Sequence, residues 1–239
     1  MNKKFHLYII IIVLFLMDSA VFSQTKYSEL ALTGRGELNL VGDTYKLQEE
    51  VLEAFIAMQK KAFKEGISIQ VVSAYRSFNR QNEIWNRKYK AYMSEGYLPQ
   101  QAIEKIIEYS TIPGTSRHHW GTDIDIVDTF QKTPQKLLSE GNYNNGGVYA
   151  NLKIWMDNNA AAFGFYLVYT NVQLRNGFKY EPWHYSYKKL SKPMLKSFLE
   201  IDLPDLIQSL NINGKGMLTE EFIDNYLRNN ILDINLKLN

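Results

Sequence analysis

Two short segments contain every histidine that follows the first 23 residues of this chain, and they constrain its fold more than any other feature. The first reads PGTSRHHWGTDID at 113–125, and the second reads YEPWHY at 180–185. Both also carry carboxylates. Imidazole and carboxylate groups are common zinc ligands, and a hydrolytic zinc site takes three protein ligands and leaves one position for water. If both segments serve one ion, the fold must bring distant parts of the chain together.

The first segment ends in a predicted strand. Ile124 and Ile126 alternate there with Asp123 and Asp125, so the two carboxylates share the polar face of the strand. Asp125 can therefore point into a cleft while the isoleucines face the core. His118 lies in the loop before the strand, close enough along the chain to reach the same ion.

The second segment supplies His184, with Glu181 three residues before it. In a regular strand these two side chains would point to opposite faces. Pro182 lies between them and interferes with strand pairing, so a local distortion can bring both side chains into one site. The sequence thus predicts a third metal ligand and a carboxylate close to it.

The rest of the composition excludes several classes of protein. Cysteine is absent, which rules out a disulfide framework, a thiolate metal site and a cysteine nucleophile. The formal net charge is only +2, and the Lys3-Lys4 pair is the only basic cluster that stands out, so we expect no nucleic-acid partner. A hydrophobic fraction of 45% is enough for one domain with a buried core, or for one such domain and a small appendage.

Residues 1–23 have the pattern of a secretory signal peptide. Lys3 and Lys4 form the positive region, an apolar run covers 7–17, and cleavage is expected after Ser23. The alternative is an uncleaved anchor, but the apolar run is shorter than the ~20 residues that span a bilayer. Export without cysteine is typical of the bacterial periplasm or cell envelope. After cleavage, no stable membrane span is expected.

Hydrophobic periodicity predicts helices mixed with short strands. We expect helices at 45–64, 79–94, 99–109 and 148–163, and strands at 67–73, 122–128, 165–169 and 179–187. Asn176-Gly177 predicts a hairpin turn before the last strand. Together these elements predict an α+β fold, in which a small, mainly antiparallel sheet carries the metal site and helices pack on its other face.

Three motifs of the chain occur together in one known family. They are Ser116, His118, Gly121 and Asp125; Glu181, Pro182, Trp183 and His184; and Ser73, Tyr75, Arg76, Ser77 and Gln81. In their order and separation they resemble the motifs of the VanY-type D-alanyl-D-alanine carboxypeptidases, within the group of zinc peptidases that includes lysostaphin and the hedgehog N-terminal domain. The resemblance covers about 45–190.

The resemblance implies a zinc-dependent carboxypeptidase that removes a C-terminal residue from peptidoglycan stem peptides, and D-Ala is the residue expected. It implies that Zn²⁺ is held by His118, Asp125 and His184, which selects His118 over the adjacent His119. The predicted organisation is a signal peptide at 1–23, a zinc peptidase domain at 24–202 and a C-terminal helical appendage at 203–239. The last segment has no counterpart in the family pattern.

The resemblance also implies the catalytic roles. Glu181 would take a proton from water and pass it to the leaving amine. Arg76 would stabilise the charge that develops on the carbonyl oxygen; alternatively, it would bind the terminal carboxylate of the substrate as a two-pronged donor. Ser116 and Gln81 would hydrogen-bond the substrate. One position departs from the pattern, because Asp123 stands where the family commonly has Ala, and we expect it to be a neighbouring carboxylate rather than a ligand.

Three other interpretations stay open. The same scaffold could carry an L,D-carboxypeptidase or an endopeptidase acting on peptidoglycan. It could also be a zinc-stabilised binding module without catalysis, although Glu181 beside the ligands argues against that. Finally, the motifs could be accidental in a structural protein. A His and Asp site also accepts divalent ions other than zinc, because affinity alone does not select the metal.

Overall fold

The computed structural model describes residues 27–173 and 175–239. The predicted signal peptide at 1–23 lies outside the described residues. Four strands form an antiparallel sheet in the order β3-β4-β6-β5. Their bounds are Ile69–Ser73 for β3, Asp123–Asp128 for β4, Phe165–Leu167 for β5 and His184–Tyr187 for β6. A second ribbon pairs β1 (Leu40–Val41) with β2 (Leu47–Gln48). The α+β class with a small antiparallel sheet is therefore confirmed.

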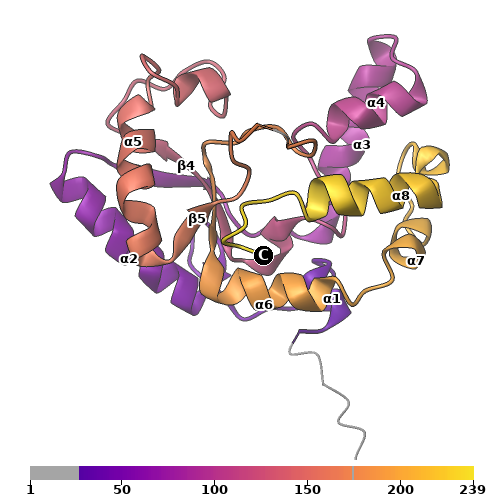
Figure 1. Cartoon of the computed structure of the whole chain (residues 1–239), viewed down its shortest axis with the longest axis horizontal. Helices are drawn as coiled ribbons and strands as arrows, with labels where there is room; N and C mark the ends of the chain where they lie inside the picture. Colours follow the sequence, from indigo (N-terminus) through magenta and orange to yellow (C-terminus); the bar gives the residue numbers. More distant parts are fainter. Residues whose placement is uncertain (1–26, 174) are drawn as a thin grey trace, which may run out of the picture.

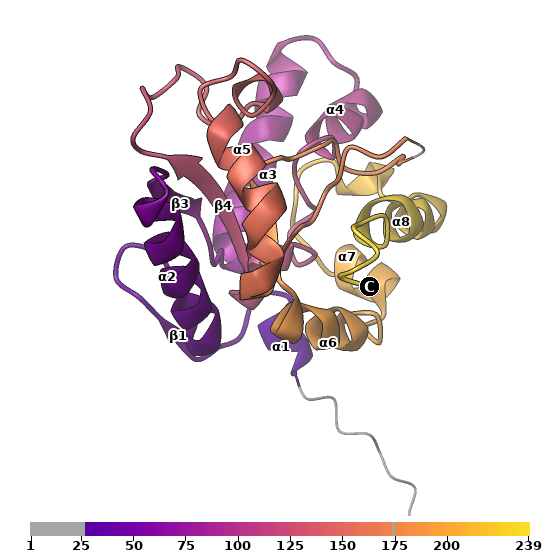
Figure 2. The same ribbon diagram turned by 60° about the vertical axis from the view of Figure 1, so that its left-hand side comes forward.

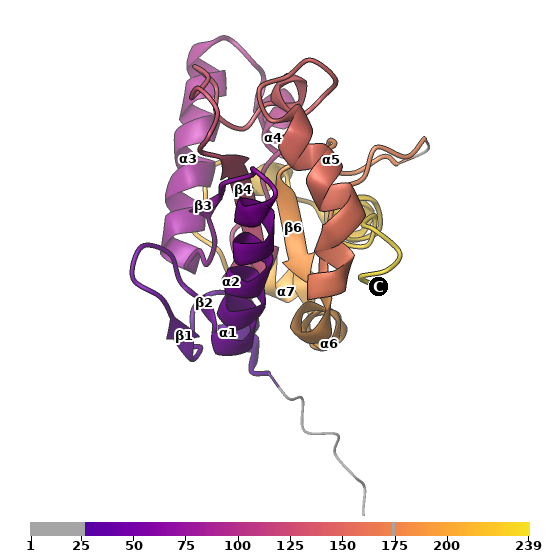
Figure 3. The same ribbon diagram turned by 90° about the vertical axis from the view of Figure 1, so that its left-hand side faces the viewer.

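Two helices cover one side of the main sheet. They are α2 (Glu49–Lys64) and α5 (Ala150–Asn159), which lie side by side in front of the strands in Figure 3. Val51, Phe55 and Met58 recur along α2 at the helical spacing and are fully buried. They share one hydrophobic cluster with Ile124 and Ile126 of β4. The helices thus hold the sheet through its apolar face and leave the opposite face for polar side chains.

The remaining helices lie to the right of the sheet and below it in Figure 1, and Figure 2 shows the same grouping from another side. Their bounds are Glu29–Leu32 for α1, Phe78–Ser94 for α3, Pro99–Ile106 for α4, Lys188–Phe198 for α6, Leu203–Gln208 for α7 and Glu220–Tyr226 for α8. They enclose a second hydrophobic cluster, which includes Trp85 of α3 and Ile103 of α4. Within the described part of the chain, no helix is both long and apolar enough to cross a membrane.

The segment from 203 to the C-terminus belongs to this second cluster. Leu206, Ile207 and Tyr226 are buried there together with Trp85. The hydroxyl of Tyr226 accepts a hydrogen bond from the backbone N–H of Ile112 at 3.2 Å. The segment is helical, as its sequence indicates, and it packs against the loop that leads to the first histidine motif. Its status as a separate appendage stays a prediction.

The predicted strand over 179–187 is too long at its start, because β6 begins only at His184. Pro182 has no N–H to donate to a strand, and it sits in a turn in which the N–H of His184 donates to the carbonyl of Glu181 at 3.0 Å. The expected hairpin turn at Asn176-Gly177 is likewise not a tight connection between strands. The N–H groups of both residues donate instead to the carboxylate of Asp233, at 2.9 and 3.0 Å.

Candidate metal centre

The register of the two central strands assembles the polar face of the sheet. Asp125 of β4 lies directly opposite His184 of β6, and Asp123 lies opposite Ser186. Directly opposed residues of an antiparallel pair stand close enough for their side chains to meet. His118 reaches the same point from the short 3₁₀ helix Arg117–Trp120, which precedes β4. Two segments far apart in the chain therefore converge, as the histidine pattern predicted.

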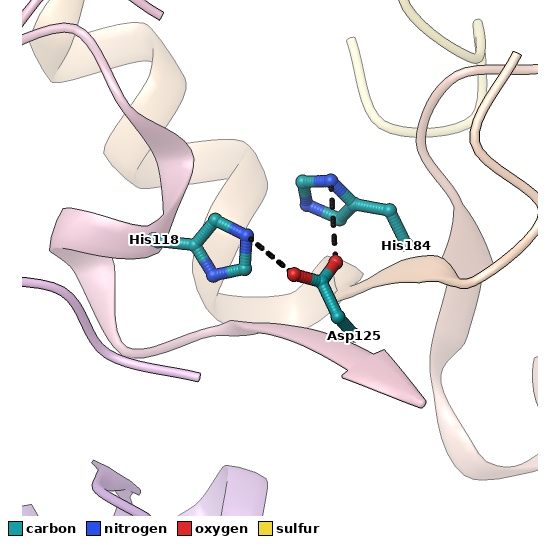
Figure 4. Close-up of side chains that lie close together, drawn as sticks. All are labelled: His118, Asp125 and His184. Atoms are coloured by element: carbon teal, nitrogen blue, oxygen red, sulfur yellow. Dashed lines mark ion pairs between the residues drawn. The ribbon is translucent and has the colours of Figure 1, made fainter. Parts of the chain in front are cut away.

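The convergence is close enough for one ion. Ligand atoms of His118, Asp125 and His184 all lie within 4.8 Å of one another (Figure 4). The Nε2 atom of His118 is 3.4 Å from Oδ2 of Asp125, and Nδ1 of His184 is 3.8 Å from Oδ1 of Asp125. All three side chains are buried. This is the only group of three or more His, Cys, Asp or Glu residues with such geometry in the described ranges 27–173 and 175–239.

Each histidine is oriented by a second hydrogen bond on its far side. Nδ1 of His118 lies 2.8 Å from the backbone carbonyl of Ala74, to which it can only donate, so its Nε2 is left with a lone pair facing Asp125. Nε2 of His184 lies 2.9 Å from the carboxylate of Asp123, which leaves its Nδ1 facing Asp125 and Glu181. Metal-binding histidines are typically held in this way, because the outer partner fixes which nitrogen carries the proton.

Asp125 provides a direct test of whether a metal fits. Its Oδ1 atom is buried and has no hydrogen-bond partner. A buried carboxylate oxygen without a donor is costly, unless a cation satisfies it. Burial by itself would raise the pKa of Asp125, but His118 and His184 outweigh burial and hold that pKa below its usual range. The carboxyl group is therefore ionised and ready to bind a divalent cation. Two imidazoles and one carboxylate match the ligand set of a hydrolytic zinc site.

Glu181 lies beside this trio. Its Oε2 atom is 3.0 Å from Nδ1 of His184, on the side of the ring that faces Asp125. Burial raises the pKa of Glu181, and its hydrogen bond to His184 opposes that rise only in part. The turn at Pro182 is what brings the two side chains together, as the sequence analysis expected. Burial also lowers the pKa of His184, but hydrogen bonds to Asp123 and Glu181 outweigh it and raise that pKa to about 10.

Arg76 projects over the same site and is braced from several directions. Its Nη1 donates to Oε1 of Gln81 at 2.8 Å, and its Nη2 donates to Oγ of Ser73 at 3.0 Å. Its backbone N–H donates to the carbonyl of His118 at 3.0 Å. Burial lowers the pKa of Arg76, against the opposing charges of Asp125 and Glu181. The guanidinium is therefore held rigidly next to the candidate ligands.

The two residues predicted to bind substrate differ in position. Ser116 lines the cavity and caps the 3₁₀ helix, its hydroxyl accepting from the N–H of His118 at 3.3 Å. Gln81 is fully buried and is absent from the cavity wall. Its amide accepts from Arg76 and donates to the carbonyl of Thr111 at 2.8 Å. As placed, Gln81 supports Arg76 instead of facing the cavity.

His119 and His118 are adjacent in the chain, yet they serve different purposes. Nε2 of His119 accepts from the N–H of Gly114 at 3.2 Å, and its Nδ1 donates to the carbonyl of Arg76 at 2.6 Å. The ring therefore bridges two loops as a neutral group. Burial is the main reason that the pKa of His119 is lowered to about 3. Gly34 packs against this ring with φ +71°, where a Cβ would come within 2.4 Å of Nδ1.

A cavity of about 450 Å³ opens above the trio. Its lining includes the candidate ligands and also Arg76, Lys88, Tyr109, Lys136, Glu140, Tyr169 and Glu181. Lys88 lies on α3, and burial lowers the pKa of its amine. Lys88 was not predicted from the sequence, because a lysine within an expected helix carries no local mark that it faces a cavity. Arg117 and Tyr169 were not predicted as cavity residues either, although Arg117 lies within the first histidine segment and Tyr169 ends an expected strand.

Comparison with known proteins adds to this geometry. Residues 44–190 match the family model VanY, described as D-alanyl-D-alanine carboxypeptidase. The chain is 33% identical over 124 residues to the D-alanyl-D-alanine carboxypeptidase of Enterococcus faecalis, which covers 52% of this chain and 41% of that protein. It is also 33% identical over 109 residues to an uncharacterized protein of Haemophilus influenzae, which covers 45% of this chain and 83% of that protein. The chain thus spans less than half of the enterococcal relative.

Three solved structures share the fold at 22% sequence identity. VanYB in complex with D-alanine-D-alanine has a TM-score of 0.52 and covers 74% of this chain and 92% of that chain. A zinc complex of a variant of the vancomycin resistance D,D-pentapeptidase VanY has a TM-score of 0.50, and the match covers 77% of this chain and 90% of that chain. The LdcB LD-carboxypeptidase has a TM-score of 0.52, and the match covers 75% of this chain and 82% of that chain. At this level of identity, the likeness establishes the fold.

Proposed function

The chain belongs to the VanY family of D-alanyl-D-alanine carboxypeptidases, and from this premise we propose that it is a zinc-dependent carboxypeptidase that removes the C-terminal D-Ala from peptidoglycan stem peptides. The observation that carries the proposal is the convergence of three ligand atoms within 4.8 Å beside a buried glutamate. The zinc complex of a VanY structure with the same fold supports the choice of metal.

Nε2 of His118, a carboxylate oxygen of Asp125 and Nδ1 of His184 would hold the ion. When bound, zinc would polarise the substrate carbonyl and lower the pKa of its bound water to about 7. The three protein ligands leave a place for that water. Nδ1 of His184 binds either a proton or the metal, so metal binding there competes with protonation and weakens as the pH falls.

Glu181 is the proposed general base and acid. Its carboxylate lies on the metal side of His184, where it can take a proton from water and then give that proton to the leaving amine. Burial raises the pKa of Glu181, which helps the group keep the proton between the two steps. A carboxylate in ordinary solvent would release it more readily.

Arg76 is proposed to stabilise the negative charge that develops on the carbonyl oxygen during attack. Its hydrogen bonds to Gln81 and Ser73 hold the guanidinium before substrate arrives, so little reorganisation is needed during the reaction. We assign Gln81 to this supporting role instead of direct substrate binding. Ser116, on the cavity wall, remains a candidate for hydrogen bonding to the peptide.

The charge of the cavity wall favours a carboxypeptidase over an endopeptidase. Besides Arg76, the cavity is lined by Lys88 and Lys136, against one acidic residue outside the metal centre, Glu140, and Lys88 is partly withdrawn from solvent. A substrate that ends in a free carboxylate gives the two lysines a partner, whereas the middle of a crosslink does not. Because the proposed substrate is peptidoglycan, we expect the protein to act in the cell envelope. Export through residues 1–23 stays a prediction.

The decisive experiment is digestion of a stem pentapeptide ending in D-Ala-D-Ala by zinc-loaded protein, followed by mass spectrometry. We expect the loss of one D-Ala, its abolition by a chelator and its recovery with zinc. Release from a tetrapeptide but not a pentapeptide would identify an L,D-carboxypeptidase instead. Cleavage of crosslinked dimers would identify an endopeptidase, and no release from any muropeptide would overturn the proposal.

A further inference from the structure

Asp123 is a carboxylate beside the metal centre that the catalytic scheme does not use. It is 0% exposed, and four side-chain donors surround it. Its Oδ2 accepts from Nε2 of His184 at 2.9 Å and from Nε of Arg117 at 3.0 Å. Its Oδ1 accepts from the hydroxyls of Thr122 at 2.8 Å and Ser186 at 2.6 Å. Burying a charge so completely requires this many partners.

These contacts argue against Asp123 as a metal ligand, although it shares the face of β4 with Asp125. Both of its oxygens are occupied by donors. It also meets His184 at Nε2, whereas Asp125 and Glu181 lie near Nδ1 of the same ring. Asp123 therefore stands behind the histidine, on the side away from the other two ligands.

We propose that Asp123, locked in place by Arg117, is a positioning residue that fixes the ring and tautomer of His184 for metal binding. The inference rests on the metal site of the proposed function. With Nε2–H donated to Asp123, the lone pair of Nδ1 is directed toward Asp125. A carboxylate behind a ligating imidazole also makes the ring a better donor to the metal, and loss of such a partner typically costs 10–100-fold in metal affinity.

Arg117 makes the buried carboxylate possible. Its guanidinium pairs with Asp123 at 3.0 Å, donates from Nη2 to Ser186 at 2.8 Å and lies over the ring of Trp120, 4.7 Å from the ring centre. Each of the two charges would be costly alone, so they form one unit. Neither Arg117 nor Asp123 is among the motif residues that carry the family resemblance, which are Ser116, His118, Gly121 and Asp125.

Zinc affinity, measured by competition with a chromogenic chelator, tests the proposal. We expect Asp123→Ala to weaken zinc binding 10–100-fold. The matched control is Asp128→Ala, which removes another buried carboxylate of β4. Asp128 accepts from the N–H groups of Ser68 at 2.9 Å and Phe130 at 3.0 Å and contacts none of the candidate ligands. We expect the control to keep wild-type zinc affinity even if it loses stability.

Asp123→Ala leaves the charge of Arg117 buried without a partner, so it could fail to fold. The double variant Arg117→Met/Asp123→Ala removes both charges, so zinc affinity can be measured without an unpaired buried charge. We expect it to fold and to show the same 10–100-fold loss of zinc affinity. Wild-type affinity in the double variant would overturn the proposal. So would an equal loss in Asp128→Ala, since that would reveal a general effect of destabilising β4.

Proton NMR of the zinc-loaded protein gives a second measurement. The imidazole N–H signal of His184 would not change if Asp123 only contributed to the stability of the fold. We expect a slowly exchanging imidazole N–H signal from Nε2 of His184, which shifts or vanishes when Asp123 is replaced. The Nδ1 protons of His118 and His119, bonded to backbone carbonyls, serve as internal references. An unchanged His184 signal in the double variant would contradict the inference.

Failure of the inference and failure of the proposed function give different results. If the wild type binds zinc tightly but releases no D-Ala, the carboxypeptidase proposal fails while the role of Asp123 stands. If the Asp123 variants bind zinc like the wild type and the wild type releases D-Ala, only the positioning role fails.

Discussion

The floor and the side wall of the cavity are built in different ways. The floor consists of His118, Asp125, His184 and Glu181, and the two strand residues are held opposite each other by the backbone ladder of β4 and β6. The wall carries Arg76 and, from α3, Lys88. Its geometry depends on side-chain hydrogen bonds such as that between Arg76 and Gln81.

This difference suggests a division of labour. The floor is rich in metal-binding and acidic groups, so it suits a cation and the movement of a proton. The wall is cationic, so it suits the anionic parts of a substrate and of the transition state. Changes to the floor should therefore abolish metal binding or the chemical step, whereas changes to the wall should alter affinity or rate by smaller factors.

The largest expected effect comes from removing a ligand. His184→Ala should abolish both stoichiometric zinc binding and D-Ala release, because two remaining ligands cannot hold a catalytic zinc ion. Metal analysis after gel filtration and an amino-acid release assay measure the two properties. Full activity in a zinc-free variant would show that the floor is not a metal site.

Glu181→Gln should separate metal binding from chemistry. We expect kcat to fall about 10²–10⁴-fold, the usual contribution of a general acid–base group, while one zinc ion stays bound. Because burial raises the pKa of Glu181, wild-type activity should also rise with pH through a carboxyl pKa above the ordinary range, and this rise should be lost in the variant. Retained function with zinc bound would favour a non-catalytic binding module.

Arg76→Lys tests the role of the wall in the transition state. Lysine keeps the charge but cannot donate to Gln81 and Ser73 while facing the cavity. We expect kcat to fall about 10²-fold with little change in KM, which is typical of a lost oxyanion donor. A rise in KM alone would assign Arg76 to the substrate carboxylate. Steady-state kinetics on a synthetic pentapeptide distinguish the two.

Lys88→Met should have a milder effect. If Lys88 attracts the anionic end of the substrate, KM should rise about 3- to 10-fold with kcat preserved, because the amine is only partly shielded from water. Lys90→Met is the matched control, since Lys90 lies on the same helix but is exposed and lies outside the cavity. Equal kinetics for both variants would remove Lys88 from substrate recognition.

The smallest effect concerns His119, which joins the wall to the floor by bridging Gly114 and Arg76. Its pKa is lowered to about 3, so between pH 6.5 and 3 the unfolded chain binds a proton that the folded chain does not. Stability should therefore fall as pH drops through this range, by up to about 1.4 kcal/mol per pH unit from this residue. The free energy of unfolding, measured by urea denaturation at pH 7, 6 and 5, should fall less steeply with decreasing pH in His119→Gln than in the wild type. Identical slopes would contradict this.

Much of the fold could be predicted from local patterns. The helix expected at 45–64 is observed as Glu49–Lys64, and the strand expected at 122–128 as Asp123–Asp128. These elements have strong periodicity, which is a local property. The connection before His184 was harder, because the turn signal at Asn176-Gly177 is satisfied by Asp233, a residue far along the chain. A local rule cannot anticipate such a partner.

The sequence by itself determined which side chains could bind a metal, since three histidines and their neighbouring carboxylates fall in two motifs and no cysteine competes with them. Only the tertiary structure decided what each neighbour does. Asp123 and Asp125 share one face of a strand, yet the register sets Asp125 opposite His184 and places Asp123 behind the ring. The physical reason is that residue type and periodicity are properties of the local sequence, whereas the partner of a buried charge depends on which strands and helices pack together.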